Sequence, residues 1–389
     1  MRKKSMKTVV VLTIITTMVC NMAHPVTPMV IKTLKLPSYM FGIFFAAMSI
    51  GNFLCSPIWG KLSDKMGRRK FLIIGILGYG VSQLGFGYSE NPIIIVIYRF
   101  LSGAFVVSFL TVILAYIADI TDKEKRLNGM MYYGAASTIG SAIGSLLGGI
   151  IGNSNYKITF LTQFILSIIV SVLMFFFLEE TVDKKKLNKI AKSKDIKKNN
   201  KLSNILDKKI LFIMSQVVIF YFASTSYNST ITYYIEDVLN LPPTMNGVFL
   251  ASAGVVAFLT NLLLTPIVGR KLGEIKGLKI MTLLLSVSMA IASISTSSII
   301  FFIFIIAFVS SASIYVPLQQ NIISKLSVHN NGEVAGIQNS SRAIGMIIGS
   351  LYSGFIFDFG NKLPFLTVSI VTMISFVILQ FRSSILELN

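Results

Sequence analysis

The chain has 389 residues, of which 53% are hydrophobic and only 13% are charged, and its formal net charge is +19. A soluble domain carries about a quarter charged residues, so a chain this apolar cannot cover its surface with polar groups and must face lipid. The composition therefore excludes an ordinary soluble protein.

Twelve apolar segments follow one another along the chain, each close to the roughly 20 residues that a membrane-spanning helix needs. They are residues 8–31, 39–58, 71–88, 93–117, 128–151, 158–178, 210–235, 245–268, 278–297, 299–322, 334–357 and 363–381. The first segment contains Pro25 and Pro28 and lacks a small-residue cleavage site, so we interpret it as a span and not as a signal peptide. We expect an all-α membrane protein with twelve transmembrane helices.

The positions of the cations predict the orientation of these helices. If the N-terminus is cytoplasmic, the inner segments hold 29 of the Lys and Arg residues and the outer segments hold four. Such a split obeys the positive-inside rule and places both termini in the cytoplasm. The net charge of +19 is therefore a topology signal, and we expect no nucleic-acid partner.

The two halves of the chain resemble each other. The glycine-rich run at residues 140–149 recurs at residues 345–354, and Leu36-Pro37 recurs as Leu241-Pro242, each 205 residues later. A Lys- and Asn-rich polar stretch separates the halves. We predict two pseudo-symmetric six-helix bundles, residues 1–178 and 210–389, joined by a basic cytoplasmic linker at residues 179–209.

The most specific motif lies between the second and third segments and reads GKLSDKMGRRK, from Gly60 to Lys70. It resembles the signature G-x-x-x-D-[RK]-x-G-[RK]-[RK] of the major facilitator superfamily. By that resemblance, the loop holds the two halves together on the cytoplasmic side. Its expected gating residues are Gly60, Asp64, Lys65, Gly67, Arg68, Arg69 and Asp119. The resemblance implies that Asp64 faces residues 332–335 and that the cations face Asp119.

Two further motifs of the same superfamily follow. Arg99 and Gly103 are similar to the R-x-x-x-G motif of antiporters, although a structural arginine bonded to a neighbouring helix is an alternative. Gly140, Gly144, Gly148 and Gly149 resemble the antiporter motif G-x-x-x-G-P-x-x-G-G and predict close helix packing. Ser145 replaces the proline of that motif, which weakens the inference of antiport.

All 16 acidic residues lie in loops or at helix ends, so no carboxylate is placed to carry a proton in the middle of a span. His24 is the titratable residue left inside a span. If transport is proton-driven, we expect His24 or the helix-end acids Glu236 and Asp237 to take part. A neutral histidine bonded beside a proline kink is the alternative.

The resemblance places the first, fourth, seventh and tenth helices around a central cavity. The polar residues that these helices and the eleventh offer for substrate or coupling are Asn21, His24, Arg99, Tyr221, Thr225, Tyr227, Asn228, Gln319, Gln320, Asn339 and Arg342. Two arginines inside spans, without acids there, leave room for an anionic substrate.

The resemblance implies alternating-access transport, with efflux of drug-like or amphiphilic molecules, driven by a proton gradient, as the leading expectation. Uptake or facilitated transport of a small metabolite or organic anion is the alternative, and a polytopic membrane enzyme is a remote one. We expect a monomer in the bacterial plasma membrane. No cofactor, metal site or enzymatic activity is expected, since the sequence contains no nucleotide-binding loop and no clustered catalytic motif.

Overall fold

The structure is a computed structural model that describes residues 6–122, 126–181, 208–326 and 331–386. The predicted linker at residues 179–209 therefore lies almost entirely outside the described residues. Within them the chain is helical and contains no strand.

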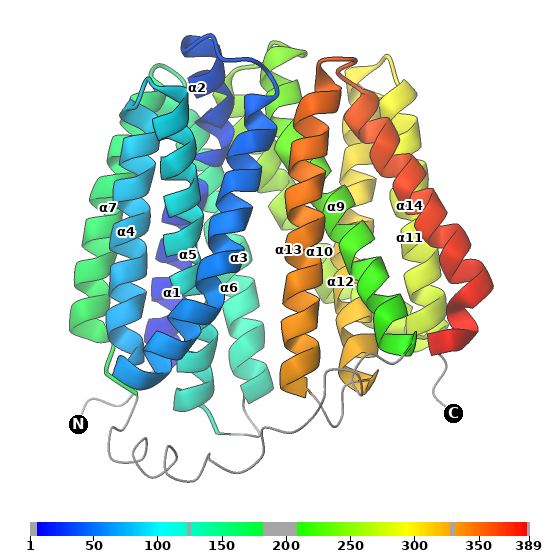
Figure 1. Ribbon diagram of the computed structural model, residues 1–389, viewed down its shortest axis with the longest axis horizontal. Helices are drawn as coiled ribbons and strands as arrows, with labels where there is room; N and C mark the ends of the chain where they lie inside the picture. Colours follow the sequence, from blue (N-terminus) through cyan, green and yellow to red (C-terminus); the bar gives the residue numbers. More distant parts are fainter. Residues whose placement is uncertain (1–5, 123–125, 182–207, 327–330, 387–389) are drawn as a thin grey trace. The chain divides into compact units, whose positions relative to one another are not determined.

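The described residues form twelve long helical segments in the expected order, the first of them broken (Figure 1). Their bounds are α1 Met6–Asn21, η1 His24–Val26, α2 Thr27–Thr33, α3 Met40–Met66, α4 Arg68–Tyr88, α5 Pro92–Ile120, α6 Arg126–Gly152, α7 Tyr156–Phe177, α9 Lys208–Asp237, α10 Pro243–Leu272, α11 Glu274–Ile294, α12 Ser298–Leu326, α13 Asn331–Phe357, α14 Leu363–Arg382 and η4 Ser383–Leu386. Eleven segments among the described residues are long and apolar enough to cross a membrane. The twelfth, α13, has 27 residues and carries more polar side chains. The predicted fold class is confirmed.

The first span is broken because proline interrupts its helical hydrogen bonding. Pro25 has no N–H to donate to the preceding turn, and its ring disfavours a continuous helix. The chain passes through the 3₁₀ turn η1 at His24–Val26 and resumes as α2, with the N–H of Thr27 bonded to the carbonyl of His24. The break places His24 at a bend in the backbone and not on a regular helix face.

Two glycines make the tight turns at corresponding points of the two halves. Gly67 joins α3 to α4 with a φ of 108°, and Gly273 joins α10 to α11 with a φ of 71°. Positive φ values of this kind are unfavourable for residues with a Cβ. The repeated turn agrees with the predicted internal repeat.

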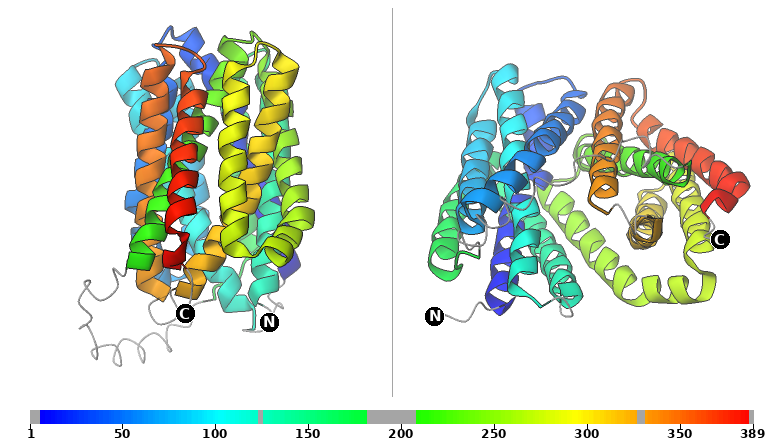
Figure 2. Two further views of the ribbon diagram at one scale, coloured as in Figure 1. Left: turned by 90° about the vertical axis from the view of Figure 1, so that its right-hand side faces the viewer. Right: turned by 60° about the horizontal axis from the view of Figure 1, so that its bottom comes forward.

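The chain divides into two compact units. Unit 1 comprises residues 1–36, 47–199 and 235–254, and unit 2 comprises residues 37–46, 200–234 and 255–389. Within unit 1, α4 packs on both α5 and α7; within unit 2, α11 packs in the same way on α12 and α14 (Figure 2). The division into domains at residues 179–209 stays a prediction.

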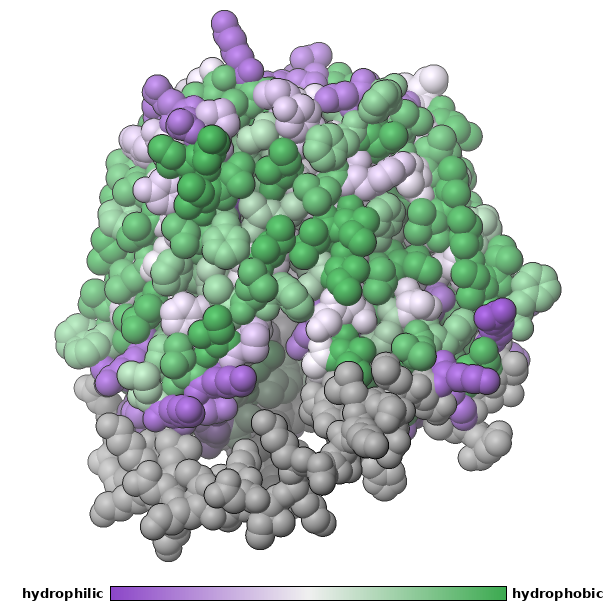
Figure 3. Space-filling model, in the orientation of Figure 1, coloured by the Kyte–Doolittle hydropathy of each residue, from purple (hydrophilic) through white to green (hydrophobic). Residues whose placement is uncertain are grey.

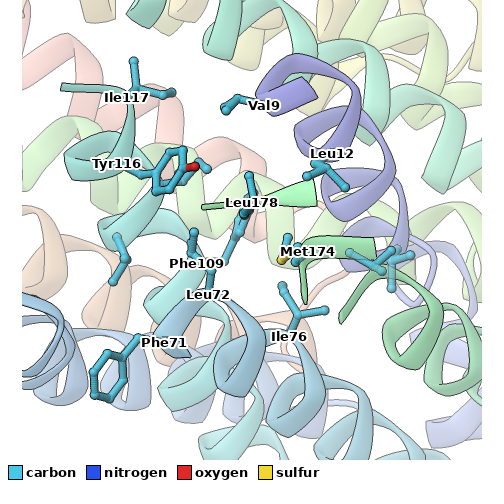
Figure 4. Close-up of a cluster of buried hydrophobic side chains, with 14 residues drawn as sticks. Val9, Leu12, Phe71, Leu72, Ile76, Phe109, Tyr116, Ile117, Met174 and Leu178 are labelled. Carbon is cyan, nitrogen blue, oxygen red and sulfur yellow. The ribbon is translucent and has the colours of Figure 1, made fainter. Parts of the chain in front are cut away.

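The core of unit 1 lies where α1, α4, α5 and α7 meet. Buried side chains including Leu12, Leu72, Phe109 and Met174 form one hydrophobic cluster there (Figure 4). Burying such side chains is the main favourable contribution to packing within a unit of this kind. The cluster fixes the helices that carry the functional residues of unit 1.

The surface agrees with a membrane environment. In the face drawn in Figure 3, hydrophobic side chains cover the middle, and hydrophilic side chains gather toward the two ends. Many large apolar side chains are exposed, among them Ile93, Phe176, Leu262 and Phe381. In water such extensive apolar exposure would be unfavourable, whereas lipid accepts it.

Candidate functional site

A cavity of about 540 Å³ lies within unit 2, between α9, α10 and α12. Its lining residues are Phe220, Tyr221, Ser224, Tyr227, Asn228, Asn261, Phe308, Val309, Ala312, Ser313, Val316, Pro317 and Gln320. The volume falls in the range of pockets that hold drug-sized ligands. The cavity is the candidate binding site.

The residues of α9 reach the cavity because they share one helix face. Tyr221, Ser224 and Asn228 follow a spacing of three and four residues, which keeps side chains on one side of a helix. Tyr227 packs against Phe308 of α12 with ring centroids 5.0 Å apart. The side-chain amide of Asn228 donates to the Ser224 carbonyl at 2.8 Å. The lining therefore combines aromatic faces with amides and hydroxyls.

Of the six predicted cavity residues on α9 and α12, four line the cavity and two do not. Tyr221, Tyr227, Asn228 and Gln320 belong to the lining, whereas the buried Thr225 lies outside it. Gln319 is buried and donates instead to the Tyr315 hydroxyl at 3.0 Å. Asn261 of α10 was absent from our prediction because a single amide in an apolar helix carries no recognisable pattern.

Helix α13 brings a polar face to the edge of the cavity. The guanidinium of Arg342 lies over the ring of Tyr221, 4.6 Å from its centroid. The amide of Gln338 donates to Gln320 Oε1 at 2.7 Å. Asn339 is exposed between these two contacts along the helix. Two of the lining residues are therefore in direct contact with α13.

Glycines explain how closely α13 approaches α9. A Cβ added to Gly345 or Gly349 would collide with the backbone oxygens of Val218 and Phe222, respectively, both on α9. In unit 1, Gly140 and Gly144 of α6 are packed against backbone oxygens of α1 at Ile14 and Met18, and Gly148 is packed against that of Met22, directly after α1. Gly149 departs from this row, since a Cβ there would lie 3.1 Å from the Cα of Gly247.

A second polar cluster lies in unit 1 around Arg99, which is only 3% exposed. Its Nη2 donates to the Thr27 hydroxyl at 2.7 Å, and its guanidinium lies 3.7 Å from the centroid of Phe86. The charge of Arg99 also acts electrostatically on His24. The structure thus brings together two of the predicted coupling residues.

Asn21, at the end of α1, forms its hydrogen bonds with residues outside the cluster around Arg99. Its amide donates to the Thr17 carbonyl at 2.7 Å and to the Ser141 hydroxyl of α6 at 3.0 Å. These bonds join α1 to α6 beside the glycine contacts. The placement gives Asn21 a packing role in this structure.

The loop between α3 and α4 forms a charged network. Nη1 of Arg68 lies 2.5 Å from Oδ1 of Asp64, and Nε of Arg68 lies 3.1 Å from Oδ2 of Asp119. Arg69 donates to the Phe175 carbonyl and stacks over the Phe175 ring at 4.5 Å. The cations of the motif are therefore oriented by partners on α5 and α7.

Other members of the motif differ in their surroundings. Lys65 is exposed, and a Cβ on Gly60 would make only ordinary contact with Thr111 at 3.9 Å. Glu180 accepts a hydrogen bond from the backbone N–H of Arg68 at 2.7 Å. Arg68 begins α4, and the dipole of a helix stabilises a carboxylate at its N-terminus. Glu180 was not predicted as a site residue, because the adjacent acids Glu179 and Glu180 before a Lys-rich stretch match no recognisable motif. The expected contact between Asp64 and residues 332–335 stays a prediction.

Comparisons with known proteins agree with these features. The family model of the Major Facilitator Superfamily matches residues 9–350 and 213–385. The chain is 26% identical over 358 residues to multidrug resistance protein 2 of Bacillus subtilis strain 168, covering 90% of this chain and 88% of that protein. It is 22% identical over 371 residues to quinolone resistance protein NorA of Staphylococcus aureus, covering 94% of each.

Solved structures share the fold. The inward open conformation of the xylose transporter XylE from E. coli matches with a TM-score of 0.76 at 13% identity, covering 97% of this chain and 96% of that one. The human organic anion transporter MFSD10 matches with a TM-score of 0.66 at 17% identity, covering 97% and 100%. The family-model match over residues 9–350 and 213–385, together with the motif at Gly60 to Lys70, shows that the chain belongs to the major facilitator superfamily of membrane transporters.

Proposed function

We propose that the protein exports aromatic, amphiphilic small molecules across the bacterial cell membrane, in exchange for protons. The observation that carries the proposal is the cavity of unit 2, which combines Tyr221, Tyr227 and Phe308 with the amides of Asn228 and Asn261. Apolar walls with a few convergent polar groups are typical of sites for drug-sized ligands. The names of the relatives in Bacillus and Staphylococcus support drug export as the direction of transport.

For the coupling ion we propose the proton, with His24 as the carrier in unit 1. The imidazole of histidine can take up and release a proton, and His24 lies at the break in the first span, in the same unit as Arg99. Proton uptake by His24 would add a second positive charge to the unit that contains Arg99, and proton release would remove it. Glu236 and Asp237 remain the second candidates.

For the gate we propose the network at the start of α4. Asp64 is well exposed, with 59% of its side chain accessible, although it is paired with Arg68. A carboxylate in this position can exchange partners at low cost, because exposed ion pairs contribute little to stability. Asp64 is therefore suited to bind another helix end in one conformation and Arg68 in the other. We also propose that the protein works as a monomer with both termini in the cytoplasm.

Flux into proteoliposomes tests the function. Purified protein would be assayed with Nile red, ethidium and 1-naphthalenesulfonate, with and without an imposed pH gradient. We expect gradient-driven flux of at least one probe and its loss in the variant Tyr227→Ala. The matched control is Tyr88→Ala, which removes an exposed tyrosine at the end of α4 that is not part of the cavity lining. Flux that requires ATP, or no flux of any probe, would contradict the proposal.

A further inference from the structure

The charge of the ligand follows from the side chains around the cavity of unit 2. None of the lining residues is ionisable as an acid at neutral pH or carries a permanent charge. A cationic ligand would therefore find no carboxylate on these walls. Aromatic faces alone attract cations weakly, so the nearest fixed charge decides the preference.

That charge is Arg342. Its guanidinium stacks on Tyr221, a lining residue, and among the described residues no carboxylate pairs with it. The other ionised side chains described in unit 2 lie near helix ends, such as Glu274, which is bonded to Lys325 at 2.5 Å. The electrostatic environment beside the cavity is thus positive.

The position of Arg342 along α13 argues against a role at the lipid surface. Its side chain is exposed, and it lies eleven residues after the start of the helix, about 16 Å along the axis. An arginine facing lipid at such depth is costly, whereas one facing a water-filled space is not. The polar neighbours Gln338 and Asn339, on the preceding turn, extend the same wet face.

We propose that the cavity of unit 2 binds aromatic organic anions, with the acidic group at Arg342 and Asn339 and the aromatic body against the contacting pair of rings Tyr227 and Phe308. Arg342 offers a planar set of N–H donors that suits a carboxylate or sulfonate. The amides of Asn228, Asn261 and Gln320 accept or donate to neutral substituents on the ring system. This proposal rests on the proposed function, because it takes the cavity to be the transport site.

The test compares two ligands of similar shape and opposite charge. Binding of 1-naphthalenesulfonate and of N,N,N-trimethyl-1-naphthylammonium to the full chain in lipid nanodiscs would be measured by equilibrium dialysis, with empty nanodiscs subtracted. We expect the sulfonate to bind at least about tenfold more tightly, since hydrogen bonds to charged groups contribute about that much. Equal binding, tighter binding of the ammonium, or no specific binding of the sulfonate would overturn the proposal.

Variants assign the preference to one residue. Arg342→Gln should weaken sulfonate binding about tenfold and leave ammonium binding unchanged or stronger, while Arg342→Lys should retain part of the preference. The matched control is Arg382→Gln, which removes an exposed cation at the end of α14 in the same unit. Equal effects of Arg342→Gln and Arg382→Gln would contradict the assignment.

Flux measurements separate this proposal from the function on which it rests. If the sulfonate binds through Arg342 but no pH gradient moves it or any other probe, the proposed transport function is refuted and the proposed preference for anions is supported. If Nile red or ethidium is transported while the sulfonate does not bind, the preference for anions is refuted and the transport function is supported.

Discussion

The glycine contacts between α1 and α6 allow a controlled perturbation of helix packing. Gly144 of α6 lies against the backbone of Met18, and a Cβ added there would come within 2.9 Å of the Met18 Cα. On the same helix, a Cβ added to Gly134 would meet nothing within 4 Å. The variants Gly144→Ala and Gly134→Ala therefore make the same chemical change in two opposite environments.

The magnitude follows from the geometry. Ordinary contact for a Cβ is 3.4–4 Å, so α1 and α6 must separate by at least about 0.5 Å to accept a methyl group in place of the glycine hydrogen at Gly144. Overpacking of this kind costs about 1–3 kcal/mol. At Gly134 the same substitution meets no atom, and replacing glycine by alanine favours a helix by up to about 1 kcal/mol. We expect the two variants to change stability in opposite directions.

The assay is the apparent melting temperature of the detergent-purified protein at a fixed heating rate, because membrane proteins often unfold irreversibly. For a unit of 150–250 residues, Gly144→Ala should lower this temperature by roughly 3–9 °C, while Gly134→Ala should leave it unchanged or raise it slightly. In unit 2, Gly349→Ala and Gly336→Ala form the equivalent pair and should differ in the same sense. Equal melting temperatures of Gly144→Ala and Gly134→Ala would refute the packing argument.

Three further predictions concern the polar residues of unit 1. His24→Gln should abolish the acceleration of flux by a pH gradient while leaving downhill exchange of substrate measurable; undiminished gradient-driven flux would remove His24 from the coupling mechanism. Arg99→Lys keeps the charge but loses the planar contact with Phe86, and should lower stability by about 1–2 kcal/mol; an unchanged melting temperature would argue against that contact. Asp64→Asn should change stability by less than about 1 kcal/mol and yet reduce flux at least tenfold, whereas Asp119→Asn should affect stability more than Asp64→Asn does; the reverse order of flux and stability losses would exclude the proposed gate.

The sequence was sufficient to predict the order of the helices, because an apolar segment of this length satisfies its backbone hydrogen bonds in lipid by forming a helix. The predicted segments mark only the apolar part of each helix. Residues 39–58, for example, belong to a helix that continues to Met66, since Lys61 and Asp64 extend into water without ending the helical hydrogen bonding. Helix ends outside the membrane leave no hydrophobic signal.

The site was less predictable for two physical reasons. Neighbouring residues on a helix point about 100° apart, so Gln319 and Gln320 look equivalent in the sequence although only Gln320 reaches the cavity. Single amides such as Asn261 carry no periodic pattern at all. The arginines were easier to recognise, because a charged side chain inside a membrane span is energetically costly and therefore indicates a functional site whatever its neighbours are.

The ligand charge proposed for the cavity of unit 2 also determines how transport responds to membrane voltage. The fixed charges of the protein return with the empty transporter, so a complete cycle moves only the charges of the ligand and of the proton across the bilayer. Exchange of one proton for one organic anion then moves two charges per cycle, and each contributes about 2.3 kcal/mol per 100 mV. A neutral ligand exchanged for a proton moves one charge, and a monovalent cation moves none. The side chains around one cavity thus make the electrical potential, which is negative inside the cell, a driving force for export in its own right.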